Sequence, residues 1–94
     1  MMPKVPVPAN MQIFIDITKS RTFALDVNSN DTINDVKLRI KASEGFAPNE
    51  QNLIYSCGEL ENGRTLFDYN INNCNSIELM LKRVKELINA MMII

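Results

Sequence analysis

The stretch DTINDVKLRIKASEG, residues 31–45, predicts the one main helix of this chain. Thr32 can cap the free amide groups of the first turn. Asp35, three residues later, stands near the capping-box position and favours the positive end of the helix dipole. Gly45 suits the left-handed position that ends a helix, and Pro48 stops any continuation. We therefore expect a helix that starts at Thr32 and runs to Gly45.

Two sets of residues divide this helix into faces. The apolar set follows helical spacing and comprises Ile33, Val36 and Ile40. The basic set is expected to face water and comprises Lys37, Arg39 and Lys41. The apolar face must therefore lie against the apolar side of a sheet.

Segments on both sides of the helix alternate between apolar and polar residues, which is typical of half-buried strands. The expected strands are residues 11–17, 22–27, 52–55 and 76–82, with a turn at 60–63 and a short helical turn at 66–69. The residues expected to point inward are Met11, Ile13, Ile15, Ile17, Phe23, Leu25, Val27, Leu53, Tyr55, Ile77, Leu79 and Leu81. This ββαββ order predicts an α+β fold with a mixed sheet, one main crossover helix and a single two-layer core.

The two ends of the chain differ from this domain, which we place at residues 11–82. Residues 1–10 hold three of the 4 prolines and are expected to form a flexible leader. Residues 83–94 place apolar side chains at helical spacing, as in an amphipathic tail that could be helical. Such a short helix is not stable alone in water, so it would need a surface to rest on.

Composition argues against several classes of function. Lys and Arg total 10 and Asp and Glu total 11, without a basic block, so neither nucleic acid nor an anionic membrane is an expected partner. No segment approaches the roughly 20 apolar residues of a membrane span, and no signal peptide is visible. We therefore expect a cytoplasmic or nuclear protein.

The chain has 2 cysteines, Cys57 and Cys74, and no histidine. The cysteines lack a CxxC spacing, so we expect reduced thiols, no metal site and no cofactor. Cys57 is the one conceivable nucleophile, but no base stands ready to activate it. Without a glycine-rich phosphate loop or paired catalytic carboxylates, the sequence predicts that the chain is not an enzyme.

From residue 11 to about residue 82 the sequence resembles the ubiquitin family. The resemblance is carried by MQIF at 11–14, DTI at 31–33, VK at 36–37, EG at 44–45, LI at 53–54, and by LE, GRTL and DYNI between 60 and 71. It implies the β-grasp fold, in agreement with the element order derived from periodicity. The string ENGRTLFDY is also similar to ubiquitin-like domains of certain chromatin-associated RING ubiquitin ligases.

Several functional positions of the family are changed here. The family's conjugating tail is Arg-Gly-Gly, whose glycines thread a narrow enzyme channel, whereas the matching stretch here is RVKE at 83–86. Asn52 and Lys82 stand where the family has arginines, the first of which contacts the activating enzyme. The resemblance therefore implies that conjugation to substrates is lost.

The lysines that build ubiquitin chains are also mostly replaced. Their positions hold Asp16, Arg21, Arg39, Ser43, Gly58 and Asn73. Lys37 alone stays in register and is a possible modification site. The alternative, which we favour, is that Lys37 is a helix residue paired with a nearby carboxylate.

The family's apolar recognition patch maps to Thr18, Ile54 and Met80, with Glu78 at the position of a neighbouring histidine. Strand alternation turns Ile54 and Met80 away from the core, where they can bind a partner. Alternatively, the tail at 83–94 covers them within the same chain.

These observations predict a non-conjugated ubiquitin-like adaptor, monomeric, that binds proteins of the ubiquitin–proteasome system. Ubiquitin receptors, proteasome subunits and a ubiquitin ligase are the expected kinds of partner. The alternative is a diverged stand-alone modifier or regulator whose tail mediates self-association.

Overall fold

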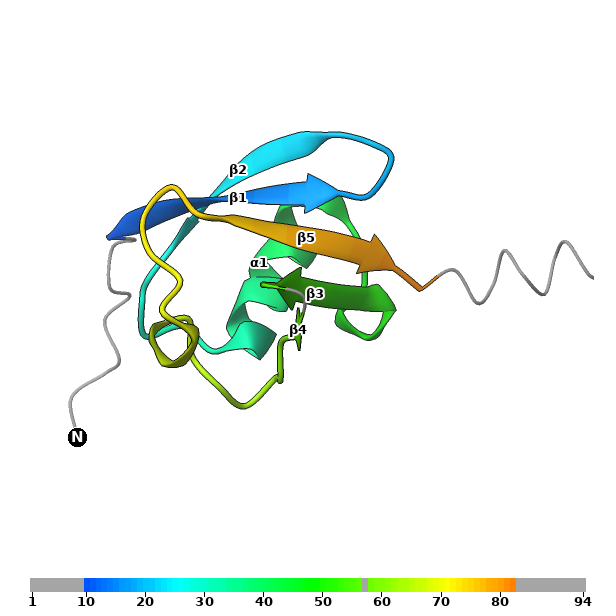
Figure 1. The fold of residues 1–94 in the computed structure, drawn as a ribbon. Coiled ribbons are helices and arrows are strands. Elements are labelled where there is room, and N and C mark those ends of the chain that lie inside the picture. Colours follow the sequence, from blue (N-terminus) through cyan, green and yellow to red (C-terminus); the bar gives the residue numbers. More distant parts are fainter. Residues whose placement is uncertain (1–9, 57, 83–94) are drawn as a thin grey trace, which may run out of the picture.

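The computed structural model, which describes residues 10–56 and 58–82, contains one five-stranded mixed sheet and one long helix (Figure 1). The elements in chain order are β1 Met11–Ile17, β2 Thr22–Val27, α1 Ile33–Glu44, the 3-10 helix η1 Pro48–Glu50, β3 Gln51–Tyr55, β4 Gly58–Glu59, the 3-10 helix η2 Phe67–Tyr69 and β5 Ser76–Leu81. The strands are ordered β2-β1-β5-β3-β4. The predicted α+β architecture is confirmed.

The first and last strands of the fold lie side by side at the centre of the sheet. β1 and β5 are parallel, with Ile15 opposite Ile77 and Ile17 opposite Leu79. The remaining neighbours, β1 with β2, β3 with β5 and β3 with β4, are antiparallel. The parallel pair requires a crossover, which the chain supplies through α1.

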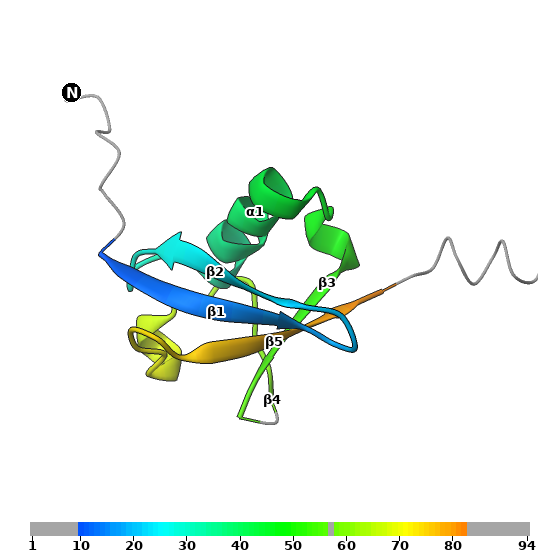
Figure 2. The same ribbon diagram turned by 90° about the horizontal axis from the view of Figure 1, so that it is seen from above.

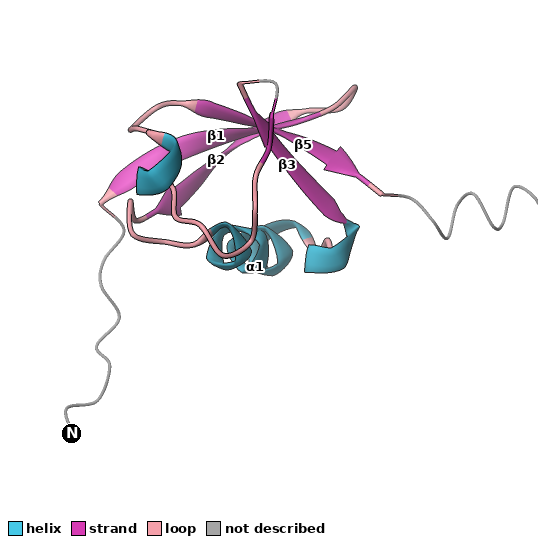
Figure 3. Ribbon diagram, turned by 60° about the horizontal axis from the view of Figure 1, so that its bottom comes forward, coloured by secondary structure: helices cyan, strands magenta, loops and turns pink. Residues whose placement is uncertain are grey.

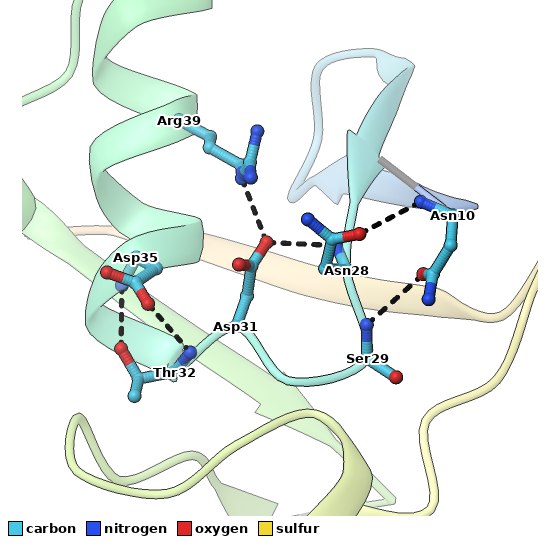
Figure 4. Close-up of polar contacts among 7 residues, drawn as sticks. All are labelled: Asn10, Asn28, Ser29, Asp31, Thr32, Asp35 and Arg39. Atoms are coloured by element: carbon cyan, nitrogen blue, oxygen red, sulfur yellow. Dashed lines mark hydrogen bonds and ion pairs between the residues drawn. The ribbon is translucent and has the colours of Figure 1, made fainter. Parts of the chain in front are cut away.

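The ends of α1 follow the sequence closely. The Asp35 amide donates to Thr32 Oγ1 at 3.1 Å, and the Thr32 amide donates to Asp35 Oδ2 at 3.0 Å, which completes a capping box (Figure 4). Gly45 has φ 87°, and its amide donates to the Lys41 carbonyl. The predicted start and stop of the helix are confirmed.

A polar cluster fixes the loop between β2 and α1 (Figure 4). Asp31 Oδ2 accepts hydrogen bonds from the Asn28 amide and from Arg39 Nε, each at 2.9 Å. The Asn10 amide in turn donates to Asn28 Oδ1 at 3.0 Å. Asn10, the last residue of the expected leader, is thus attached to the domain, whereas residues 1–9 and the expected tail at 83–94 lie outside the described residues.

The core lies between α1 and the sheet face toward it (Figures 2 and 3). Its fully or almost fully buried members are Ile13, Ile15, Ile17, Leu25, Val27, Ile33, Val36, Ile40, Leu53, Leu60, Leu66, Ile71, Ile77 and Leu79. The inward residues expected from alternation are all in this set or are packed against it. The connections add Leu60, Leu66 and Ile71, which close the end of the core.

Some boundaries differ from the sequence analysis. β3 begins at Gln51 rather than Asn52, β5 ends at Leu81, and the two-residue strand β4 was not expected. A strand of this length is too short to show alternation, so its partner β3 defines it. The β1–β2 turn has no glycine, and Lys19 adopts the positive φ of 58° that the turn requires.

Candidate interaction face of the sheet

The sheet face that points away from α1 carries Ile54 and Met80. Ile54 on β3 is opposite Glu78 on β5, and Met80 is opposite Asn52. Ile54 and Met80 are therefore diagonal neighbours on one face, not directly opposite each other. Met80 is 44% exposed and Ile54 is half-buried.

Thr18 and Glu78 join the same face. Thr18 follows the end of β1, and its amide donates to the Leu79 carbonyl at 3.1 Å. Its hydroxyl donates to Glu78 Oε2 at 2.9 Å. The four residues singled out from the sequence thus come together, although Thr18 and Glu78 are 60 positions apart.

Two further carboxylates stand in line with Ile54 across the strands. Asp16 is opposite Glu78 in the parallel pair of β1 and β5. Glu59 on β4 is opposite Ile54. Directly paired residues project from the same face of a sheet, so the order across the strands is Asp16, Glu78, Ile54, Glu59. Strand alternation placed Asp16 on the outward side of its strand but did not mark it as a site residue, and Glu59 was missed because nothing in the sequence indicated β4.

An open hollow of about 470 Å³ lies beside Met80, at the end of β1 and β5. Its apolar side chains are those of Ile17, Phe46, Met80 and Leu81, and its basic ones are those of Lys19 and Arg21. Arg21 forms an ion pair with Glu44 and lies 5.5 Å from the centre of the Phe23 ring. Arg21 therefore has its charged partner within the domain, which indicates a structural role for this side chain.

Lys37 is buried, so the expectation that it faces water is wrong. Its side chain is directed toward the connection after β4, where Nζ donates to Asn62 Oδ1 at 2.8 Å, and the residue is 8% exposed. The bonded partner is an amide oxygen rather than the expected carboxylate. Burial lowers the pKa of Lys37, and repulsion from Lys82 adds to this, while Glu59 acts in the opposite direction. Modification at Lys37 stays a prediction, and its buried, bonded amine speaks against it.

Neither a metal cluster nor a membrane helix is found in the described part of the chain. Residues 10–56 and 58–82 contain no group of three or more His, Cys, Asp or Glu side chains that could hold an ion. Within the same residues, no helix is both long and apolar enough to cross a bilayer. Cys74 is an exposed free thiol, and Cys57 lies outside the described residues.

Comparison with known proteins gives a match to the ubiquitin family model over residues 13–84. The chain is 33% identical over 76 residues to the UV excision repair protein RAD23 homolog of Dictyostelium discoideum, which covers 81% of this chain and 22% of that protein. It is 37% identical over 68 residues to the mouse E3 ubiquitin-protein ligase UHRF2, covering 72% of this chain and 8% of that one.

A relative of similar length is Ubiquitin-like protein 1 of Schizosaccharomyces pombe. It is 25% identical over 71 residues, which are 76% of this chain and 91% of that protein. The chain therefore spans about a fifth or less of the two longer relatives and most of the short one. In all three, the similarity extends over 68 to 76 residues.

Proposed function

Because this chain belongs to the ubiquitin family and has its β-grasp fold, we propose that it is a non-conjugated adaptor that binds protein partners through the sheet face of Ile54 and Met80. The observation that carries the proposal is the joint placement of these two apolar side chains on the face turned away from the core. Methionine adapts its shape to different contacts, which suits a surface that meets more than one partner.

The size of this surface indicates a transient contact. Two apolar side chains bordered by hydroxyl and carboxylate groups are far fewer than an obligate interface needs. We therefore expect a monomer that meets ubiquitin receptors, proteasome subunits or a ubiquitin ligase in the cytoplasm or nucleus. A similar segment occurs in an E3 ubiquitin-protein ligase, which supports a partner from the ubiquitin system.

Ile54→Ala tests the face directly. It should weaken binding of a ubiquitin-binding domain by roughly tenfold, because an interface anchor contributes energy when the partner desolvates it. The free energy of unfolding should fall by no more than about 1 kcal/mol, because Ile54 lies outside the core. Titration calorimetry and thermal melts measure the two effects separately.

Leu38→Ala is the matched control. Leu38 is 47% exposed on α1, away from this face, so the variant should bind as the wild type does. Unchanged binding by Ile54→Ala would reject the proposal. If Ile54→Ala and deletion of residues 84–94 each lowered stability, and did so less than additively, the tail would be the occupant of the face.

A second prediction concerns conjugation. In a reaction with ubiquitin-activating enzyme and ATP, this 94-residue chain should form no thioester, because residues 83–86 read RVKE where the family requires glycines. Ubiquitin in a parallel reaction provides the positive control. A reducible adduct of this chain on the enzyme's cysteine, seen on a non-reducing gel, would contradict the non-conjugated part of the proposal.

A further inference from the structure

The charged groups around Ile54 indicate what kind of partner fits this face. We infer that it binds a basic segment, in which Lys or Arg side chains flank an apolar one that contacts Ile54 and Met80. This inference rests on the proposed function and adds the chemistry of the partner to it.

The first support is the order of the residues across the strands. Glu78 stands on one side of Ile54 and Glu59 on the other, and Asp16 lies beyond Glu78. Three strand spacings of about 4.8 Å separate the outermost members, so the row spans roughly 14 Å. An apolar anchor on Ile54 therefore has carboxylates on both sides of it.

The second support is that no ion pair within the described residues neutralises Asp16 or Glu78. Within residues 10–56 and 58–82, ion pairs join Arg21 to Glu44, Arg39 to Asp31 and Arg64 to Glu61, and none includes a member of the row. The side-chain hydrogen-bond partners of Glu78 and Asp16 are hydroxyl groups. Thr18 Oγ1 donates to Glu78 at 2.9 Å, and Thr22 Oγ1 donates to Asp16 at 3.3 Å. The charges of Asp16 and Glu78 therefore remain available to a partner, whereas Glu59 also interacts electrostatically with Lys37 in the same domain.

The third support is the placement of like charges side by side. Asp16 and Glu78 are direct neighbours on adjacent strands, an arrangement that is unfavourable unless a cation relieves it. The basic residues near this face lie at its Met80 end. Lys82 follows β5 two positions after Met80, and Lys19 and Arg21 line the hollow beside Met80. A cationic group of a partner would lie between Asp16 and Glu78, which relieves the repulsion on binding.

The charge of this face comes from the carboxylates of Asp16, Glu78 and Glu59, and Asn52, which lies opposite Met80, is uncharged. Complementary potential governs the rate and selectivity of association, so the favoured partners differ in charge from those of a basic face.

Three synthetic helical peptides that differ only in the residues flanking a central leucine test the inference with the full chain. Each carries a central leucine, and its flanking residues are lysine, glutamine or glutamate. We expect the lysine peptide to bind most tightly, to shift the Ile54 and Glu78 amide resonances in NMR titrations, and to weaken as salt is raised. The glutamate peptide should bind most weakly.

Charge-neutral variants locate the effect. Glu78→Gln and Asp16→Asn should each weaken binding of the lysine peptide by roughly two- to fivefold, the range of exposed ion pairs. Binding of the glutamine peptide should stay unchanged. Asp26→Asn is the matched control, with the same change of charge. Asp26 on β2 is opposite Gln12, which is four positions along β1 from Asp16. Gln12 and Asp26 are thus roughly 13 Å or more from Asp16, so the Asp26→Asn variant should bind the lysine peptide as the wild type does.

The outcomes separate this inference from the adaptor proposal. Equal binding of the lysine and glutamate peptides at Ile54 would overturn the inference and leave the adaptor face in place. The same holds if Asp26→Asn weakens binding of the lysine peptide as much as Glu78→Gln and Asp16→Asn do. If no peptide shifts the Ile54 resonance, the inference fails, and the titration with a ubiquitin-binding domain decides the adaptor proposal. If Glu78→Gln lowers the melting temperature of the free protein and shifts resonances of residues 83–94, the chain's own tail occupies the face and an external basic partner is rejected.

Discussion

Leu79→Ala should lower the free energy of unfolding by about 2–5 kcal/mol, because it removes a branched side chain from the one core of the domain. Leu79 is 0% exposed on β5, opposite Ile17 on β1 and opposite Leu53 on β3. The cavity would open at the centre of the sheet, where both neighbouring strands limit collapse. A domain of this size has a small margin of stability, so such a loss is a large part of the total.

Met80→Ala provides the matched control, one residue along the same strand. Met80 is 44% exposed on the opposite face, so its loss should change stability by less than about 1 kcal/mol. Urea unfolding followed by circular dichroism compares the two variants with the wild type. Equal midpoints for Leu79→Ala and the wild type would show that the face assignment of β5 is reversed.

Gln51→Glu should be the second large perturbation, with a cost of roughly 3–5 kcal/mol at pH 7, because it leaves a buried carboxylate without a cation. Gln51 is 1% exposed. Its Nε2 donates to the Lys37 carbonyl at 2.9 Å and to the Phe46 carbonyl at 3.0 Å, so the amide joins β3 to α1 and to the segment after it. A carboxylate of the same shape would face two carbonyl oxygens with no hydrogen to donate.

The pH dependence of this variant follows from the sign of the expected shift. Burial raises the pKa of the new carboxyl above its unfolded value of about 4.3, so the folded state holds its proton to higher pH. Relative to the wild type at the same pH, the cost should be smallest near pH 4 and should grow as pH rises through the folded pKa. Denaturant melts at pH 4, 5.5 and 7 measure this trend.

Asn49→Asp is the control for Gln51→Glu, since it makes the same amide-to-acid change two residues earlier at an exposed position. Its effect should be small and nearly independent of pH over the same range. A Gln51→Glu cost equal to that of Asn49→Asp would mean that water reaches the Gln51 side chain.

The sequence was sufficient wherever the deciding interaction is local. The capping box joins residues three apart, Gly45 ends α1 through its own φ, and alternation assigned the inward residues of β1, β2, β3 and β5. These signals are local because backbone geometry repeats every two residues in a strand and every 3.6 in a helix. They determined the α+β architecture and the outward direction of Ile54 and Met80.

The tertiary structure decided what depends on pairing between distant segments. The burial of Lys37 depends on Asn62, the role of Gln51 depends on carbonyls of Lys37 and Phe46, and β4 exists through its pairing with β3. None of these leaves a periodic signal, because each partner is brought in by the fold rather than by its place in the sequence. The same holds for the row of Asp16, Glu78, Ile54 and Glu59. The sequence by itself placed Asp16, Ile54 and Glu78 on their strands but not Glu59, and the register of four strands placed all four side chains side by side.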